Sequence, residues 1–255
     1  MSESILEVSD LTMRFGGLLA VNGVGLTIKK GQIVSMIGPN GAGKTTVFNC
    51  LTGFYQPTSG KIIFAKQEIQ GLPGYQIARK GMIRTFQHVR LFKDMTVLEN
   101  LLVAQHQHMN NSLLAGLFKT RSYRNAEKQA LDNAIYWLEK VHLLDDANRE
   151  AGTLAYGQQR RLEIARCMVT RPSLLMLDEP AAGLNPSETE ALKQLIRDLR
   201  DNHQISVLLI EHDMKLVMDI SDHIIVINQG TPLASGTPEQ VRHNPAVIKA
   251  YLGEE

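Results

Sequence analysis

Four short apolar runs along the chain predict buried β-strands. Each of them is nearly uninterrupted by polar residues, which is typical of strands in a sheet that is covered on both faces. A helical pattern lies between two of the runs and begins directly after Pro186. The order strand, helix, strand predicts an α/β fold with a mainly parallel sheet. The four runs are residues 33–37, 174–177, 206–210 and 224–227.

Two other regions of the chain show different patterns. Residues 1–30 and 61–69 contain shorter, more alternating segments with glycine-rich turns, which predicts an antiparallel β subdomain. Residues 95–146 are mostly helical in pattern and carry no strong strand signal. We therefore expect one domain over 1–255, with an α/β core at about 1–94 and 165–255 that includes the β subdomain, and an inserted helical lobe at about 95–164.

The composition is that of an ordinary globular protein. The 255 residues are 44% hydrophobic and 21% charged, and the formal net charge is +1. No global field draws such a chain to nucleic acid, so we expect no nucleic-acid partner. Cys50 and Cys167 lie in apolar stretches and are too few for a disulfide framework or a zinc site. We expect both to be small buried side chains in a reducing compartment.

The chain shows no signal for secretion or for membrane insertion. Residues 1–10 have neither a basic segment nor an apolar core of the kind found in signal peptides. No apolar run reaches the roughly 20 residues that a membrane helix needs. We expect a cytosolic protein, one that would reach a membrane only through a partner.

A glycine-rich segment carries the strongest local signal for chemistry. It matches the pattern G-x-x-x-x-G-K-[ST], and it lies between a predicted strand and a predicted helix. Backbone N–H groups of such a loop turn toward phosphate oxygens, and the helix N-terminus adds positive potential. A glycine turn before a helix matches the pattern by chance in about one chain in a hundred. The predicted phosphate-binding residues are Gly38, Pro39, Asn40, Gly41, Ala42, Gly43, Lys44, Thr45 and Thr46.

Within this P-loop two side chains have specific expected roles. Lys44 would reach the β- and γ-phosphates of ATP, and the Thr45 hydroxyl would be a ligand of Mg²⁺. The apolar run 174–177 ends in Asp178 and Glu179, which suits the acidic end of a strand beside a P-loop. Asp178 would hold Mg²⁺ through its water shell, and Glu179 would be the general base for the attacking water. The competing interpretation is a pair of solvated loop acids.

A histidine follows the next predicted strand. His212 comes just after the run 206–210, where its side chain could contact the γ-phosphate. A single histidine at such a position is more often an ordinary surface residue. By itself this feature carries little weight.

The segment before the acidic strand resembles a motif of a known family. Leu154, Ala155, Tyr156, Gly157 and Gln158 resemble the LSGGQ signature of the ABC ATPases. The order and spacing of the other motifs are also similar to that family, from the P-loop through 84–87 to the signature, the acidic pair and the final histidine. The resemblance covers nearly the whole chain and implies a P-loop ABC ATPase that binds ATP and Mg²⁺.

The resemblance also implies roles for single residues. Phe15 occupies the place of the aromatic residue that stacks on adenine, and Gln87 that of the Q-loop glutamine. That glutamine joins Mg²⁺ and the γ-phosphate to the transmembrane partner, so Gln87 counts as both a catalytic and a metal residue. Glu179 matches the general base and His212 the switch histidine. The segment around Gly157 matches the one that meets a nucleotide held by the opposite subunit, so the resemblance implies a dimer with two ATP molecules between its subunits.

Three residues depart from the family pattern. Ala155 and Tyr156 replace the serine and the first glycine of the signature, and Asn185 replaces an aspartate in the loop after the acidic strand. Ala155 cannot donate a hydroxyl group to the γ-phosphate, and one charge-assisted hydrogen bond contributes about 1.5–3 kcal/mol. We hypothesise an asymmetric dimer in which the site completed by this signature hydrolyses ATP more weakly. A homodimer and a heterodimer both stay open.

Three stretches resemble one subfamily in particular. Residues 84–92, 154–161 and 236–253 are similar to the ATP-binding subunits of bacterial high-affinity branched-chain amino-acid importers. This resemblance implies a second ATPase subunit, two transmembrane permease subunits, an indirect periplasmic binding protein and a place on the inner face of the cell membrane. The cargo rests on the resemblance alone. Alternatives are urea or short-amide import, lipopolysaccharide export, a non-transport ABC ATPase and a P-loop kinase.

The stretch 101–124 has two open interpretations. Its apolar residues could form part of a groove for a permease loop, or they could be the buried stripe of a helix within the lobe.

Overall fold

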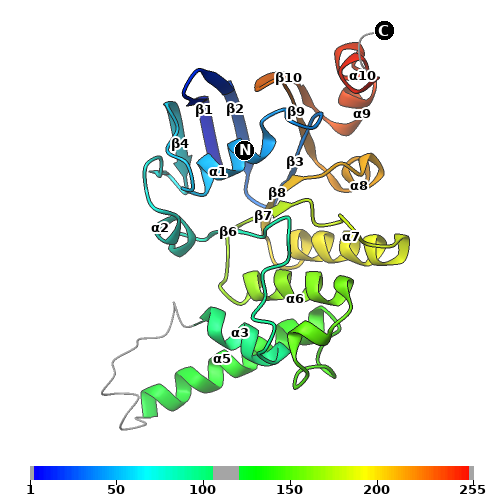
Figure 1. Cartoon of the computed structure of the whole chain (residues 1–255). Coiled ribbons are helices and arrows are strands. Elements are labelled where there is room, and N and C mark those ends of the chain that lie inside the picture. Colours follow the sequence, from blue (N-terminus) through cyan, green and yellow to red (C-terminus); the bar gives the residue numbers. More distant parts are fainter. Residues whose placement is uncertain (1–2, 106–120, 253–255) are drawn as a thin grey trace. The chain divides into compact units, whose positions relative to one another are not determined.

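The computed structural model describes residues 3–105 and 121–252. The chain forms two compact units. The first unit combines residues 1–87 with 173–255, and the second unit comprises residues 88–172. Each unit is described separately below, and Figure 1 labels their helices and strands.

The first unit contains an antiparallel four-stranded sheet with the strand order β2-β1-β4-β5. Inward-facing residues alternate with exposed ones along much of β1, which explains the alternating pattern of the N-terminal sequence. This sheet is the predicted β subdomain. Its strands are β1 (Ser4–Phe15), β2 (Leu18–Lys29), β4 (Ser59–Phe64) and β5 (Gln67–Glu68).

A six-stranded sheet forms the centre of the first unit, with the order β10-β9-β3-β8-β7-β6. All neighbours pair in parallel except β9 and β10, which form an antiparallel hairpin. Every residue of β3, β7 and β8 is buried, as the apolar runs predicted. The α/β class with a mainly parallel sheet is confirmed. The strands are β3 (Ile33–Ile37), β6 (Met82–Arg84), β7 (Leu174–Asp178), β8 (Ser206–Ile210), β9 (His223–Asn228) and β10 (Thr231–Gly236).

Helices cover both faces of the six-stranded sheet. Helix α1 (Lys44–Leu51) contributes Val47, Phe48 and Leu51 to an apolar core that joins it to both sheets of the unit. On the other face a second core brings β3 and β9 against α8 and the two C-terminal helices. The remaining helices of this unit are α2 (Gly74–Arg79), α7 (Pro186–Asp201), α8 (Met214–Ile220), α9 (Pro238–Arg242) and α10 (Pro245–Leu252).

Asn185 has a clear structural role at the start of α7. Its side chain accepts a hydrogen bond from the backbone N–H of Glu188 at 3.0 Å, and the Glu188 carboxylate accepts one from the N–H of Asn185. Pro186 occupies the first turn of the helix. This reciprocal capping needs a side-chain oxygen that either asparagine or aspartate supplies. The departure at 185 therefore preserves the cap and removes one negative charge.

The second unit is helical. Its described elements include α3 (Val97–Gln105), α5 (Arg121–Lys140), α6 (Tyr156–Met168) and a 3₁₀ turn at Ala151–Thr153, and these three α-helices pack against one another. The unit spans residues 88–172, and α6 within it continues to Met168, beyond the predicted lobe of about 95–164. Residues 106–120 of the stretch 101–124 lie outside the described residues, so its two interpretations stay open.

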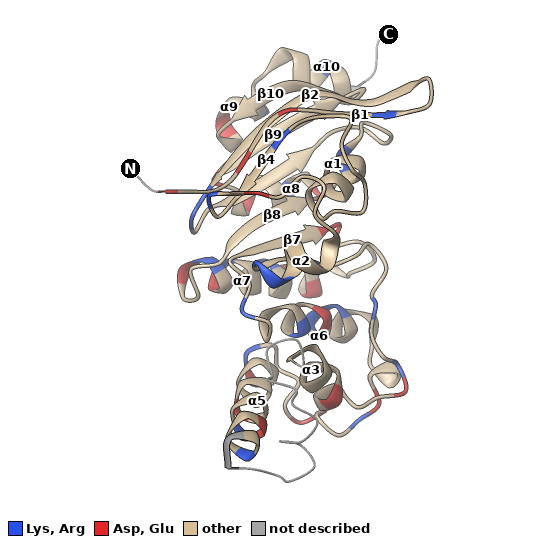
Figure 2. Ribbon diagram, turned by 90° about the vertical axis from the view of Figure 1, so that its left-hand side faces the viewer, with Lys and Arg blue, Asp and Glu red and all other residues tan. Residues whose placement is uncertain are grey.

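Positions of both charge signs are distributed along the described chain. Lys and Arg are interspersed with Asp and Glu along the ribbon (Figure 2). Within residues 3–105 and 121–252, no helix has both the length and the apolar character that crossing a membrane requires.

Candidate functional site

A pocket of about 560 Å³ in the first unit contains most of the residues that the motifs single out. It lies at the carboxyl ends of parallel strands β3, β7 and β8, where ligands of open α/β sheets bind. Among the described residues, its lining is Phe15, Leu18, Leu19, Ala20, Asn40, Gly41, Ala42, Gly43, Lys44, Thr45, Thr46, Glu179, His212, Gln229 and Gly230. The structure therefore brings the P-loop, the aromatic candidate, the acidic residue and the histidine to one hollow.

The glycines of the P-loop are required by its backbone path. Gly43 has φ +97°, and a Cβ atom there would lie 2.7 Å from the carbonyl oxygen of Ala20. Gly38 has φ +153°, and a Cβ atom there would lie 2.0 Å from the carbonyl oxygen of Ile227. Helix α1 starts at the next residue, Lys44, without a side-chain cap. Its first N–H groups are thus left for an anion, as at other phosphate sites.

Lys44 is held over the loop by backbone carbonyl groups. Its Nζ donates to the oxygen of Gly38 at 2.7 Å and to that of Pro39 at 2.9 Å. The side chain is buried, and this desolvation lowers the pKa of Lys44, while the charges of Glu179 and Asp178 act in the opposite direction. A bound phosphate would place negative charge beside this buried ammonium and stabilise its charged form.

The carboxylate of Glu179 is held by two side chains. Gln87 donates from Nε2 to Oε2 of Glu179 at 2.9 Å, and Nε2 of His212 lies 2.8 Å from Oε1. The backbone of Glu179 has φ +48°, a left-handed conformation that is uncommon outside glycine and that is typical of functional sites. Its N–H donates to the oxygen of Ile210 at 2.9 Å, which fixes this turn to the end of β8.

Asp178, the preceding acid, forms a buried ion pair that the motifs did not predict. Its Oδ2 accepts a hydrogen bond from Nη2 of Arg84 at 2.6 Å. Arg84 is the last residue of β6, and its Nη1 also donates to Oδ1 of Asn49 on α1 at 2.7 Å. In the sequence, Arg84 stood out only as part of the stretches 84–87 and 84–92, which carry the family resemblance but give it no role.

Phe15 forms an aromatic pair at the rim of the pocket. It ends β1, is about 39% exposed, and its ring lies edge-to-face with that of Tyr55 at 5.1 Å between centroids. Tyr55 is another residue that sequence reasoning missed, because it belongs to a loop without a recognisable motif. The exposed ring of Phe15 offers a stacking surface for a planar base.

Glu211 is a third residue without a predicted role. This buried carboxylate accepts hydrogen bonds from the N–H groups of Ala181 at 2.6 Å and His212 at 3.0 Å. Burial raises the pKa of Glu211, and the backbone hydrogen bonds act against that increase. It ties the turn after Glu179 to the turn that carries His212.

The signature residues belong to the helical unit, whereas the pocket is lined by described residues of the first unit. Ala155 precedes α6 at the N-cap position, where it offers no side-chain acceptor. The Oε1 of Gln158 accepts a hydrogen bond from the N–H of Ala155 at 3.1 Å, which is half of a capping box. Leu154 is buried and Gly157, in the first turn of α6, is also buried.

Tyr156 is anchored to a buried charge pair within the helical unit. Its hydroxyl accepts a hydrogen bond from Nη2 of Arg160 at 3.1 Å. Arg160 is fully buried and pairs with Glu163 at 2.8 Å. The other oxygen of Glu163 accepts from the N–H of Arg90 at 3.1 Å. The tyrosine that replaces a signature glycine is therefore part of a defined network.

The donors that the sequence proposed for Mg²⁺ are a hydroxyl (Thr45), an amide (Gln87) and a carboxylate (Asp178), all of the first unit. No cluster of three or more His, Cys, Asp or Glu residues that could hold a metal occurs in the described part of the chain. Magnesium commonly uses one or two carboxylates with waters and substrate phosphates, rather than a full protein cage. The oxygen donors fit this mode.

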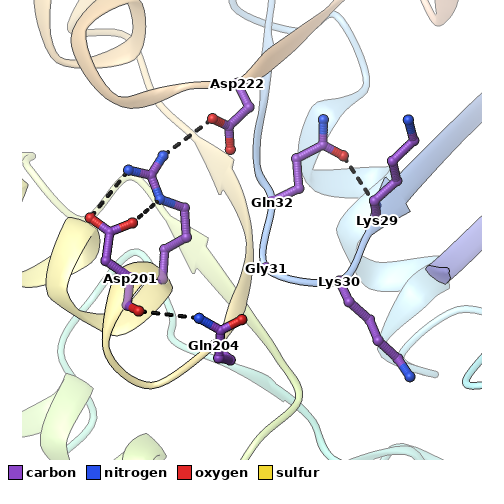
Figure 3. Close-up of a pocket in the computed structure, with 8 residues that line it drawn as sticks. Lys29, Lys30, Gly31, Gln32, Asp201, Gln204 and Asp222 are labelled. Carbon is purple, nitrogen blue, oxygen red and sulfur yellow. Dashed lines mark hydrogen bonds and ion pairs between the residues drawn. The ribbon is translucent and has the colours of Figure 1, made fainter. Parts of the chain in front are cut away.

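A second hollow of about 630 Å³ occupies the opposite edge of the six-stranded sheet. It lies where β3, β8 and β9 begin, and Figure 3 shows Lys29 and Lys30 on the opposite side from Asp201 and Gln204. Arg200 forms ion pairs with both aspartates that line it, with Asp201 at 2.6 Å and with Asp222 at 3.2 Å. Although larger, this hollow has no glycine-rich loop and lies at the edge of the sheet where ligands do not usually bind.

Comparison with known proteins identifies the family. The sequence profile described as "ABC transporter" matches residues 21–182, and one described as "Branched-chain amino acid ATP-binding cassette transporter" matches residues 231–255. The chain belongs to the ABC transporter family.

Two curated relatives match over their full length. The chain is 73% identical over 254 residues to the high-affinity branched-chain amino acid transport ATP-binding protein BraF of Pseudomonas aeruginosa, and 67% identical over 254 residues to LivG of Escherichia coli. Both matches cover 100% of each chain. The ADP conformation of MJ1267, an ATP-binding cassette of an ABC transporter, superposes with a TM-score of 0.86 at 32% identity, covering 99% of this chain and 100% of that one.

Proposed function

We propose that this chain binds and hydrolyses ATP to power the import of branched-chain amino acids through a membrane permease. The observation that carries the proposal is the Glu179 carboxylate, held by Gln87 and His212 beside a pocket that a P-loop lines. The full-length similarity to BraF and LivG supports the cargo.

The residues of the pocket suit hydrolysis of a bound triphosphate. The P-loop N–H groups and the Lys44 ammonium would bind the phosphates and stabilise the charge of the transition state. Glu179 would accept a proton from the attacking water, and His212 would orient Glu179 through the contact at 2.8 Å. The ring of Phe15 would stack on adenine. Thr45, Gln87 and Asp178 would hold Mg²⁺, which supplies neutralising charge at the phosphates when it is bound.

The signature segment would complete a site on a second ATPase subunit. The N-terminus of α6 provides free N–H groups and a positive dipole end for a phosphate, and Gly157 permits a close approach. Loss of the γ-phosphate would weaken the bridge between subunits, so the nucleotide state would bias a dimer between open and closed forms. Because Ala155 lacks a hydroxyl, the site that this segment completes would be the weaker one. Equal turnover at both sites of the assembled complex contradicts that asymmetry.

The remaining partners follow from the same proposal. They are two transmembrane permeases, a periplasmic binding protein acting indirectly, and a position on the cytoplasmic side of the membrane. Within the described residues no helix could span a bilayer, so attachment would depend on the permeases.

Uptake of labelled leucine tests the proposal. Cells lacking the gene are complemented with the wild-type chain, with Lys44→Ala, or with Lys29→Ala as a control in the opposite hollow. Wild type and Lys29→Ala should restore high-affinity uptake, whereas Lys44→Ala should not, because it removes a phosphate contact and leaves the fold intact. Uptake that is independent of the gene would show that the cargo is wrong, and labelled urea is then the next substrate.

A further inference from the structure

Arg84 links three parts of the proposed nucleotide site. Its guanidinium contacts Asp178 at the end of β7 at 2.6 Å and Asn49 on α1 at 2.7 Å. It also lies 5.4 Å from the ring centroids of both Phe48 and Phe86. One side chain thus joins the helix that follows the P-loop, the acidic strand end and the segment that leads to Gln87.

The pair is enclosed by protein. The side chains of Arg84 and Asp178 are 7% and 5% exposed. The Nε of Arg84 is buried and has no hydrogen-bond partner in the described part of the chain. A buried ion pair of this kind is often no more stabilising than apolar residues of the same volume. Stability alone therefore gives little reason to place a guanidinium here.

The geometry of the contact suggests what the guanidinium does. It donates to Oδ2 of Asp178, and among the described residues no side chain is bonded to Oδ1, so the carboxylate is oriented with that oxygen available. Lys44, whose pKa responds to the charge of Asp178, is the other nearby cation. Without Arg84, the carboxylate could turn toward Lys44, the ammonium expected to bind phosphate.

The same short segment holds both acids of the pair. Arg84 bonds to Asp178, and Gln87, three residues later, bonds to Glu179. Parallel pairing of β6 with β7 sets this alignment, because Arg84 is in register with Met176. A shift of the segment 84–87 would therefore reach both carboxylates.

We infer that Arg84 is a positioning residue that orients Asp178 for the water shell of Mg²⁺. It sets how strongly Mg²⁺ enhances ATP binding and has little effect on ATP binding without the metal. This inference rests on the proposed function, since it assigns a residue to the same site.

Equilibrium binding of a fluorescent, non-hydrolysable ATP analogue to the purified full chain tests the inference. Affinity is measured in excess Mg²⁺, in EDTA and across a Mg²⁺ titration, for wild type, Arg84→Met and Arg84→Lys. In Arg84→Met the half-saturating Mg²⁺ concentration should rise about tenfold or more, the value of one charge-assisted hydrogen bond, with affinity in EDTA nearly unchanged. Arg84→Lys should recover part of the loss. Arg79→Met, on the exposed end of α2, is the matched control and should behave as wild type.

A double-mutant comparison separates positioning from loss of fold. If Arg84 acts through Asp178, then Arg84→Met should change the Mg²⁺ titration very little in an Asp178→Asn background, which also removes the unpaired buried charge. An equal loss of affinity in EDTA and in Mg²⁺, or an unchanged Mg²⁺ titration in Arg84→Met, overturns the inference. Absence of analogue binding by the wild-type chain would instead overturn the proposed function.

Discussion

The Nε2 atom of His212 lies 2.8 Å from Oε1 of Glu179, two residues from loops that follow different strands of the same sheet. Gln87 holds the second oxygen of the same carboxylate at 2.9 Å. A general base must be oriented before it can accept a proton from a bound water. This arrangement gives Glu179 two such contacts.

Replacing Glu179 by glutamine should stop hydrolysis while preserving ATP binding. Glutamine keeps the size of the side chain and an oxygen that can accept from Gln87, but it cannot accept the proton of the attacking water. General acid–base catalysis typically contributes about 10²–10⁴-fold, so phosphate release should fall by about that factor. Phosphate release and analogue binding are measured together, with the exposed Glu190→Gln as the control. Hydrolysis within a few-fold of wild type would remove Glu179 from the role of base.

Replacing Phe15 by alanine should weaken recognition of the base and not of the phosphates. Stacking of a base on an aromatic ring is worth about 1–3 kcal/mol, so the Kd for ATP should rise by about five- to 150-fold. The inhibition constant of inorganic triphosphate, measured by competition with the fluorescent analogue, should be the same in both proteins. Tyr55→Ala should give a smaller effect of the same kind, because Tyr55 supports the ring edge-to-face.

The control for this experiment is Tyr75→Ala. Tyr75 is an exposed aromatic residue on α2 that does not line the pocket. A loss of triphosphate binding in Phe15→Ala would show a damaged P-loop and would contradict the adenine assignment.

Breaking the buried Arg160–Glu163 pair should cost more than removing both charges. Arg160→Met leaves a buried carboxylate without its cation, which typically costs about 3–5 kcal/mol. Arg160→Met with Glu163→Gln should recover most of this loss, since glutamine still accepts from the N–H of Arg90. Urea unfolding measures both values, and equal losses in the single and double variants would contradict the prediction.

The pH dependence of stability gives an independent check on Glu163. Burial raises the pKa of Glu163 above 4.5, while Arg160 and the Arg90 N–H oppose the shift. The folded state then binds more protons than the unfolded state, so this contribution to stability is present below pH 4.5 and is lost as the pH rises toward the folded pKa. Arg160→Met raises this pKa further, so the loss should become larger and extend to higher pH, and adding Glu163→Gln should abolish it.

Both cysteines should resist thiol reagents in the native protein. Burial raises the pKa of Cys50 to about 11 and that of Cys167 to about 12. At pH 8 a thiol with a pKa of 9.0 is about 10% thiolate, whereas one with a pKa of 11 is about 0.1% thiolate. Maleimide labelling at pH 8 should be slow until urea unfolds the chain. An added exposed cysteine, Ala246→Cys on α10, should react at once, and rapid native labelling of the wild type would contradict the burial.

The sequence by itself determined the local chemistry of this protein. The P-loop follows from glycines whose φ values only glycine adopts easily, and the strand and helix on either side of it follow from apolar patterns in adjacent residues. Asp178 and Glu179 could be placed beside the P-loop in advance because they end an apolar strand, whereas the role of His212 rested on the resemblance to the ABC ATPases. The buried state of both cysteines followed from their apolar neighbours in the same way.

Only the tertiary structure decided which side chains touch. The Arg84–Asp178 pair joins residues 94 positions apart, and it depends on the register of β6 against β7. The Phe15–Tyr55 and Glu211–Ala181 contacts likewise join residues that are far apart in the sequence. The compact helical unit comprises residues 88–172, and the lobe boundaries at about 95 and 164 stay a prediction from local pattern. Periodicity records which face of a segment is buried, whereas register and long-range packing depend on the free energy of the whole fold.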